Sequence, residues 1–148
     1  MKLKLSQRKS TNNLIVNNLW IYHTQAKNRS RMKPPFITYQ LSIHLKNKVT
    51  LTIGKLGSFE FPAGHYIYTG SANRNIEARI RRHLSQRKSL KWHIDYLLNS
   101  KEACITKVER FTESECAVNQ KTKGSILIKQ LGATDGKNGC GSHLKFLG

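Results

Sequence analysis

Tyrosines followed closely by arginines are the residues of this chain best suited to chemistry. Tyr66 and Tyr68 stand two apart in an apolar run that ends at Thr69-Gly70-Ser71, so their side chains would share one face of a strand. Arg79 and His83 follow at a spacing of four, which places them on one side of a helix. Phenol hydroxyls, backbone N–H groups and guanidinium forks around one point suit the binding of a phosphodiester.

The net charge of the chain favours the same class of ligand. The 148 residues include 26 Lys+Arg against 8 Asp+Glu, a formal net charge of +18. Such an excess is typical of nucleic-acid-binding domains. A basic protein of another kind, such as one that binds the ribosome or a membrane surface, would have a similar charge.

The cysteines and the apolar runs indicate the compartment. Cys104, Cys116 and Cys140 have no CxxC spacing, so we expect reduced intracellular thiols, with the first two buried as small apolar residues. The spacing of Cys140 and His143 does not fit a zinc ribbon or finger. No run approaches the roughly 18 apolar residues of a membrane-spanning helix. We therefore expect a cytoplasmic, nucleoid-associated protein without a membrane partner.

The N-terminal residues differ in composition from the rest of the chain. The first 31 carry seven Lys or Arg and no acidic residue, and Pro34-Pro35 follows shortly after. We expect a disordered basic arm over residues 1–35 and a single domain over residues 36–148. Met32 is an alternative start of translation.

Alternating apolar and polar residues predict the strands that would carry the tyrosines. Residues 38–45 and 49–53 both alternate across a tight turn, which predicts a β-hairpin between them. The other expected extended segments are residues 58–61, 65–69 and 105–111. Together they predict a small mixed or antiparallel sheet of three to four strands.

Helices are expected to flank this sheet, so the predicted fold class is α/β (α+β). Asn75 would cap a helix over residues 76–84. Ser89 would cap a second helix over 90–98, and Thr112 or Ser114 would open a third over 113–121. Residues 125–131 are predicted as a last helical turn or a strand.

A series of short motifs, in order along the chain, resembles the GIY-YIG nuclease superfamily. The resemblance is closest to a small archaeal and bacterial subgroup, stand-alone or fused to DNA-repair domains, and runs from about Ile37 to Leu144. Any one tripeptide is weak, whereas the ordered series is specific. The matching pieces are Ile37-Thr38-Tyr39, Tyr68-Thr69-Gly70, Arg79, Arg82-His83-Leu84, the run from Lys91 to Leu98, Glu115-Cys116-Ala117 and Gly141-Ser142-His143-Leu144.

This resemblance implies a metal-dependent endonuclease that hydrolyses DNA phosphodiester bonds in repair or recombination. Glu115 would hold Mg²⁺ or Mn²⁺, and Arg79 would stabilise the transition state. Tyr68 or Tyr39 would activate the attacking water, with Tyr68 favoured, and His83 would be an auxiliary proton carrier. The chain has only 8 acidic residues, which argues against a two-metal site.

The expected partner is structured, branched or damaged DNA. Trp92 is predicted in the core, with stacking on a base as the alternative. The residues expected to contact nucleic acid are Gly70, Ser71, Arg74, Arg81, Arg82, Arg87, Lys88 and Lys91.

Two departures from the family pattern keep other functions open. Ile37 stands where the first motif has glycine, and the asparagine that closes the motif set has no clear counterpart. The alternative is therefore a catalytically inactive nucleic-acid-binding module on the same scaffold. A small RNA-associated structural protein would need none of these motifs.

Overall fold

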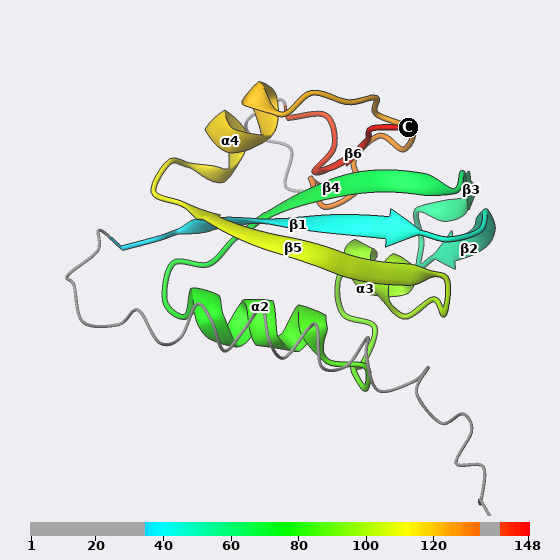
Figure 1. Ribbon diagram of the computed structural model, residues 1–148, viewed down its shortest axis with the longest axis horizontal. Helices are drawn as coiled ribbons and strands as arrows, with labels where there is room; N and C mark the ends of the chain where they lie inside the picture. The colour runs from blue at the N-terminus through cyan, green and yellow to red at the C-terminus, as the bar shows by residue number, and fades with distance from the viewer. Residues whose placement is uncertain (1–34, 134–139) are drawn as a thin grey trace, which may run out of the picture. The chain divides into compact units, whose positions relative to one another are not determined.

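The computed structural model describes residues 35–133 and 140–148. The expected basic arm therefore lies outside the described residues, except for Pro35. Within them the chain forms a four-stranded antiparallel sheet in the order β5-β1-β4-β6, a two-stranded sheet β2-β3 and three helices (Figure 1), so the predicted fold class is confirmed. The elements are β1 (Thr38–Leu45), β2 (Val49–Ile53), β3 (Gly57–Phe61), β4 (Gly64–Ser71), α2 (Ile76–Leu84), α3 (His93–Leu98), β5 (Ala103–Phe111), α4 (Glu115–Lys121) and β6 (Leu144–Phe146).

Strand β1 is central, and its pairing corrects the predicted hairpin. Residues 38–45 and 49–53 do form strands, but β1 pairs with β4 and β5 along its two edges. No edge of β1 remains for β2, which pairs with β3 instead. Directly after β1, the Lys46 amide donates to the Glu102 carbonyl at 2.9 Å and so continues the contact with the segment that begins β5.

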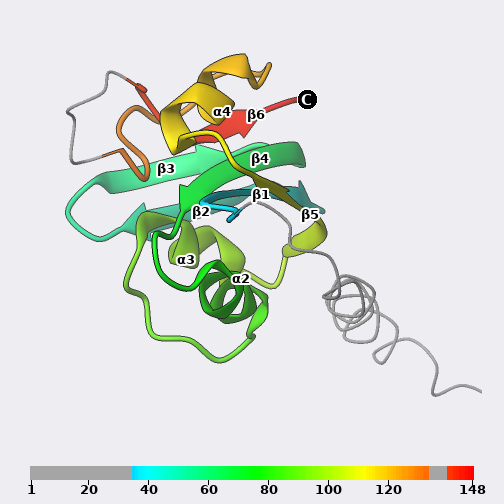
Figure 2. The same cartoon turned by 90° about the vertical axis from the view of Figure 1, so that its left-hand side faces the viewer.

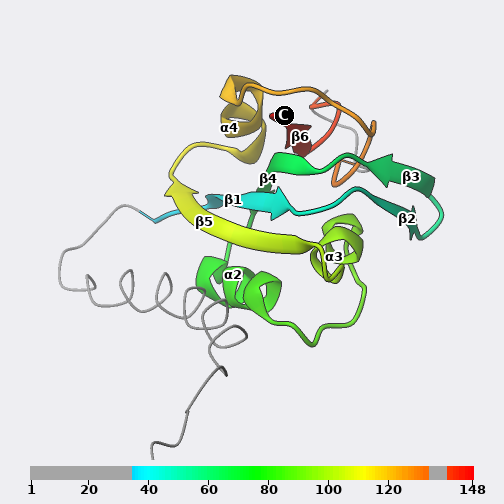
Figure 3. The same ribbon diagram turned by 45° about the vertical axis from the view of Figure 1, so that its right-hand side comes forward.

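The two faces of β1 are covered by different helices. Tyr39, on one face, contacts His83 of α2. On the other face the amide of Gln40 donates to Thr122, directly after α4. Figures 2 and 3 show the resulting layers, with α2 and α3 on one side of the strands and α4 on the other. Both faces are buried, since Leu41 is 0% exposed and Gln40 only 7%.

Helix boundaries follow the capping residues. Helix α2 begins and ends as predicted, and the Asn75 Oδ1 accepts from the Ala78 amide at 2.9 Å. Helix α3 begins at His93, later than predicted. The Asp95 carboxylate accepts from the backbone amides just before the helix and holds that segment extended. Ser114 caps α4.

The C-terminal segment adds a strand that the sequence did not predict. Strand β6 pairs with β4 through residues 66–68. Residues 125–131 are neither helix nor strand, and Ser125 forms one bridge with Phe146. Among the described residues, no helix has both the length and the apolar character needed to cross a membrane.

Candidate active site

A pocket of about 300 Å³ lies at the end of β4, where Tyr68, Gly70 and Ser71 line it. Four of its lining residues, Tyr39, Tyr68, Arg79 and Glu115, are the core of the site expected from the sequence. They come from β1, β4, α2 and α4, so the fold brings together residues up to 76 positions apart. The other lining residues are Gly70, Ser71, Lys91, Trp92, His93 and Gly132.

Tyr39 packs directly against a glycine of the neighbouring strand. Tyr39 and Gly70 are cross-strand partners, and a Cβ atom added at Gly70 would lie 2.5 Å from the Cζ of the Tyr39 ring. Real Cβ atoms do not approach other atoms so closely. The glycine that follows Tyr68 in the second motif therefore makes room for the tyrosine of the first.

His83 lies behind Tyr39, in the core. Its Nε2 is 2.7 Å from the Tyr39 hydroxyl, and its Nδ1 is buried without a hydrogen-bond partner. Burial, followed by the positive charge of Lys88, lowers the pKa of His83 to about 3. The imidazole is thus neutral near pH 7, and either accepts from the Tyr39 hydroxyl or donates to it, according to its tautomer.

The two site tyrosines are protonated in this environment. Burial raises the pKa of both phenols, and the negative charge of Glu115 raises the two pKa values further. Arg79 acts in the opposite direction on both pKa values. The Tyr68 ring meets His83 edge-on, with ring centroids 5.9 Å apart. Tyr66, in contrast, donates to the Pro62 carbonyl and does not line the pocket.

Arg79 is held at the pocket by two contacts. Its Nη1 donates to the Ser71 carbonyl at 2.6 Å, and its Cζ lies 4.9 Å from the centroid of the Trp92 ring. Trp92 is half-buried and lines the pocket, so the prediction that it belongs to the core is wrong. Stacking of Trp92 on a base stays a prediction.

Glu115 faces the pocket from the first turn of α4. Its side chain is 28% exposed, and Oε1 is 3.4 Å from the Nδ1 of His143. No role in the site was predicted for His143, although Gly141-Ser142-His143-Leu144 is one of the matching motifs. Nothing in its spacing from Glu115 indicates the contact.

A single divalent ion fits the donors present. No three His, Cys, Asp or Glu residues cluster as metal ligands in the part of the chain that the structure describes. Mg²⁺ commonly uses one or two carboxylates together with waters and substrate phosphate. The Glu115 carboxylate, open to a pocket that also holds Arg79 and Lys91, is such a donor.

The remaining basic residues of the predicted nucleic-acid interface are distributed differently. Lys91 lines the pocket, together with Gly70 and Ser71. Arg82 pairs with the buried Asp95 through two hydrogen bonds of 2.8 and 2.9 Å, and Lys88 donates to the His83 carbonyl. The others, Arg74, Arg81 and Arg87, are exposed and do not line the pocket.

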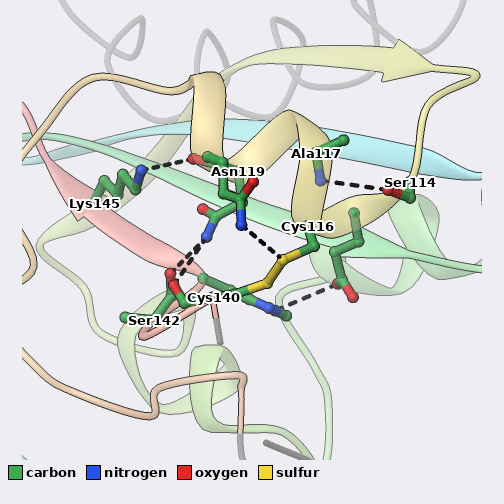
Figure 4. The surroundings of a disulfide bond; sticks show 10 residues. Ser114, Cys116, Ala117, Asn119, Cys140, Ser142 and Lys145 are labelled. Atoms are coloured by element: carbon green, nitrogen blue, oxygen red, sulfur yellow. Dashed lines mark hydrogen bonds and ion pairs between the residues drawn. A yellow bond between two sulfur atoms is a disulfide. The ribbon is translucent and has the colours of Figure 1, made fainter. Parts of the chain in front are cut away.

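The cysteines correct the prediction of reduced thiols. Cys116 and Cys140 form a disulfide, with their Cα atoms 5.9 Å apart (Figure 4). Cys104 has a free thiol and is half-buried. The sequence could not show the pairing, because the two cysteines are 24 residues apart and no local pattern links them.

Comparison with known proteins gives one match. Residues 38–148 match the family described as Domain of unknown function DUF123. No curated protein and no solved structure matches the chain. The matched segment includes every residue of the pocket, and the chain belongs to the DUF123 family.

Proposed function

We propose that this protein is a metal-dependent endonuclease that hydrolyses DNA phosphodiester bonds, in repair or recombination. The observation that carries the proposal is the convergence of Tyr39, Tyr68, Arg79 and Glu115 on one pocket. These are the residues to which the GIY-YIG resemblance gives catalytic and metal-binding roles. We also propose that the protein acts in the cytoplasm and that its substrate is structured or damaged DNA.

Binding of the phosphate falls to the cationic side of the pocket. Arg79 and Lys91 line the space, and the Ser71 carbonyl and the Trp92 ring fix the Arg79 guanidinium. A fixed guanidinium donates to phosphate oxygens without reorganising, and so favours the transition state in which those oxygens gain charge.

Glu115 would hold Mg²⁺ or Mn²⁺, which when bound supplies positive charge and Lewis acidity at the phosphate. Glu115 lines the pocket together with both tyrosines, which supports this role. Its negative charge raises the pKa of both phenols. If the bound metal neutralised the charge of Glu115, one cause of the raised pKa of both phenols would be removed, and a phenolate would form more easily.

The hydrogen bonds favour Tyr39 as the residue that orients and deprotonates water. Its hydroxyl is 2.7 Å from the His83 Nε2, whereas Tyr68 contacts His83 through its ring. With Nε2 as the donor, His83 and Arg79 would both stabilise the Tyr39 phenolate. The phenol would release its proton to solvent in the pocket, and the phenolate would then take a proton from the attacking water. Tyr68 would then position the water. This order reverses the preference for Tyr68 drawn from the sequence.

Nicking of supercoiled plasmid and of branched or damaged duplexes, with Mg²⁺ or Mn²⁺, tests the proposal. We expect Arg79→Ala and Glu115→Ala to abolish cleavage, and Tyr39→Phe to reduce it more than Tyr68→Phe. Lys101→Ala is the matched control, because Lys101 is exposed, does not line the pocket and is not among the residues expected to contact nucleic acid. Equal cleavage by wild type and Glu115→Ala would refute the assignment of the metal-binding residue.

A nucleic-acid-binding module without catalysis is the second candidate. The raised pKa values of both site tyrosines favour it, because a protonated phenol cannot act as a base. This candidate predicts DNA binding that weakens with salt and no cleavage of any of these substrates with either metal.

A further inference from the structure

The C-terminal segment joins two walls of the pocket. Leu144 pairs with Tyr68 in the β4–β6 register, and the His143 carbonyl accepts from the Thr69 amide at 2.9 Å. The same segment also contacts α4, which begins at Glu115. Residues 140–145 therefore connect the strand that carries Tyr68 with the helix that carries Glu115.

Three residues of this segment besides His143, namely Cys140, Ser142 and Lys145, are attached to α4 and its C-cap (Figure 4). Cys116 is bonded to Cys140, and the side-chain amide of Asn119 donates to the Ser142 carbonyl at 2.8 Å. The Lys145 ammonium donates at 2.6 and 2.7 Å to carbonyls at the end of the helix. A helix of seven residues is too short to be stable alone, so its position depends on tertiary contacts, and these attachments are part of them.

His143 sits in this segment with an unsatisfied nitrogen. Its Nδ1 is buried and makes no hydrogen bond, and it lies 3.4 Å from the Glu115 Oε1. A buried polar atom without a partner is costly. A small rotation of the Glu115 side chain would close the distance and let Nδ1–H donate to the carboxylate.

We propose that His143 is a positioning residue for Glu115, and that the Cys116–Cys140 disulfide maintains this contact. The proposal takes the metal-binding role of Glu115 from the proposed function. Carboxylates that bind metals are themselves commonly held by hydrogen bonds from neighbouring groups, and loss of such a neighbour lowers metal affinity 10–100-fold. Here the imidazole would fix one carboxylate oxygen and leave the other directed into the pocket.

The disulfide makes the contact depend on the redox state. Cys116 is adjacent to Glu115, and Cys140 is three residues before His143. The disulfide therefore links Glu115 covalently to His143 through only a few residues. A dithiol would open it by thiolate attack on one sulfur, followed by intramolecular release of the mixed disulfide. The two cysteines gain two electrons and two protons to become thiols, and the dithiol becomes a disulfide. Glu115 would then lose both the covalent tether beside it and its imidazole partner.

Substitutions of His143 test the positioning role through the affinity for Mn²⁺, measured by electron paramagnetic resonance on the full chain. Asparagine places its amide nitrogen where Nδ1 lies, whereas glutamine places it where Nε2 lies. We expect His143→Gln and His143→Leu to weaken Mn²⁺ binding about tenfold or more, and His143→Asn to restore most of it. Cleavage should show the same order. Equal affinity in His143→Gln, His143→Asn and wild type would overturn the proposal, even if His143→Leu does not fold.

Reduction tests the role of the disulfide. We expect dithiothreitol, or Cys140→Ser, to weaken Mn²⁺ binding as His143→Gln does, and to speed amide hydrogen exchange in residues 115–121. Cys104→Ser is the matched control and should respond to dithiothreitol as wild type does. Unchanged exchange and unchanged affinity on reduction would overturn this role.

Failure of the proposed function would look different. If wild type neither binds Mn²⁺ nor cleaves DNA, the metal site is refuted, and the exchange experiment alone decides. Faster exchange of residues 115–121 in both reduced wild type and His143→Gln, but not in His143→Asn, would still support His143 as the residue that positions Glu115. Equal exchange rates of residues 115–121 in wild type, reduced wild type, His143→Gln and His143→Asn would overturn the positioning role of His143.

Discussion

Replacing Gly70 with alanine is the sharpest test of how the two tyrosine motifs fit together. The added Cβ would lie 2.5 Å from Cζ and 3.0 Å from Cε2 of the Tyr39 ring. Tyr39 is 1% exposed, and its hydroxyl is hydrogen-bonded to His83, so the ring has little room to move. The φ of Gly70 is not positive, so the backbone conformation at this position does not require glycine.

The expected cost follows from these contacts. Inserting a methyl group into a packed interior costs about 1–3 kcal/mol, and we expect the upper part of that range because the contacts are with a rigid ring. The lower entropy of the unfolded chain offsets about 0.4–1 kcal/mol. The net loss of about 2 kcal/mol should lower the urea midpoint by about 1 M.

Urea unfolding of four proteins isolates the cause: wild type, Gly70→Ala, Tyr39→Val and the double variant. Valine removes the ring but remains suited to a strand. In the Tyr39→Val background we expect Gly70→Ala to be neutral or slightly stabilising. The coupling free energy between the two sites should then be about 2–3 kcal/mol. If Gly70→Ala costs the same in both backgrounds, the ring is not the reason for the glycine.

Three further predictions concern stability and use the same unfolding assay. His83 has a folded-state pKa of about 3, below its unfolded value of about 6.5, so the unfolded chain binds the proton first as the pH falls. Stability should drop by about 2–3 kcal/mol between pH 7 and 4.5, and His83→Gln should remove this drop. Asp95→Ala should cost about 3 kcal/mol, because it leaves the Arg82 guanidinium and two backbone amides without their buried acceptor; a cost below 1 kcal/mol would contradict this. Reduction of the disulfide, which spans 24 residues, should cost about 3 kcal/mol by loop entropy, and Cys104→Ser should show the same loss.

Local patterns predicted the elements well, and pairings poorly. Helix α2 was predicted to the residue because Asn75 and the apolar spacing after it are both local signals. The start of α3 was missed because Asp95 reaches back to the amides of Lys91 and Trp92, which competes with the helix. The hairpin was wrong because alternation identifies a strand but not its neighbours. That β1 lies between β4 and β5 depends on residues far along the chain.

The parts of the candidate site also differ in how well the sequence predicted them. Tyr39, Tyr68 and Arg79 were predictable because β1, β4 and α2 are regular elements with local sequence signals, and because the family resemblance assigned roles to these three residues. The close approach of β1 and β4 at the pocket also depends on Gly70, which makes room for the Tyr39 ring. Glu115 was predicted as well, and Ser114 is a local signal for the start of its helix. The contact of its carboxylate with His143 was not predicted, because His143 lies in a segment without helix or strand that begins at the disulfide-bonded Cys140. A segment of this kind has no periodicity, so the contact that we propose to position Glu115 could not be predicted from the sequence.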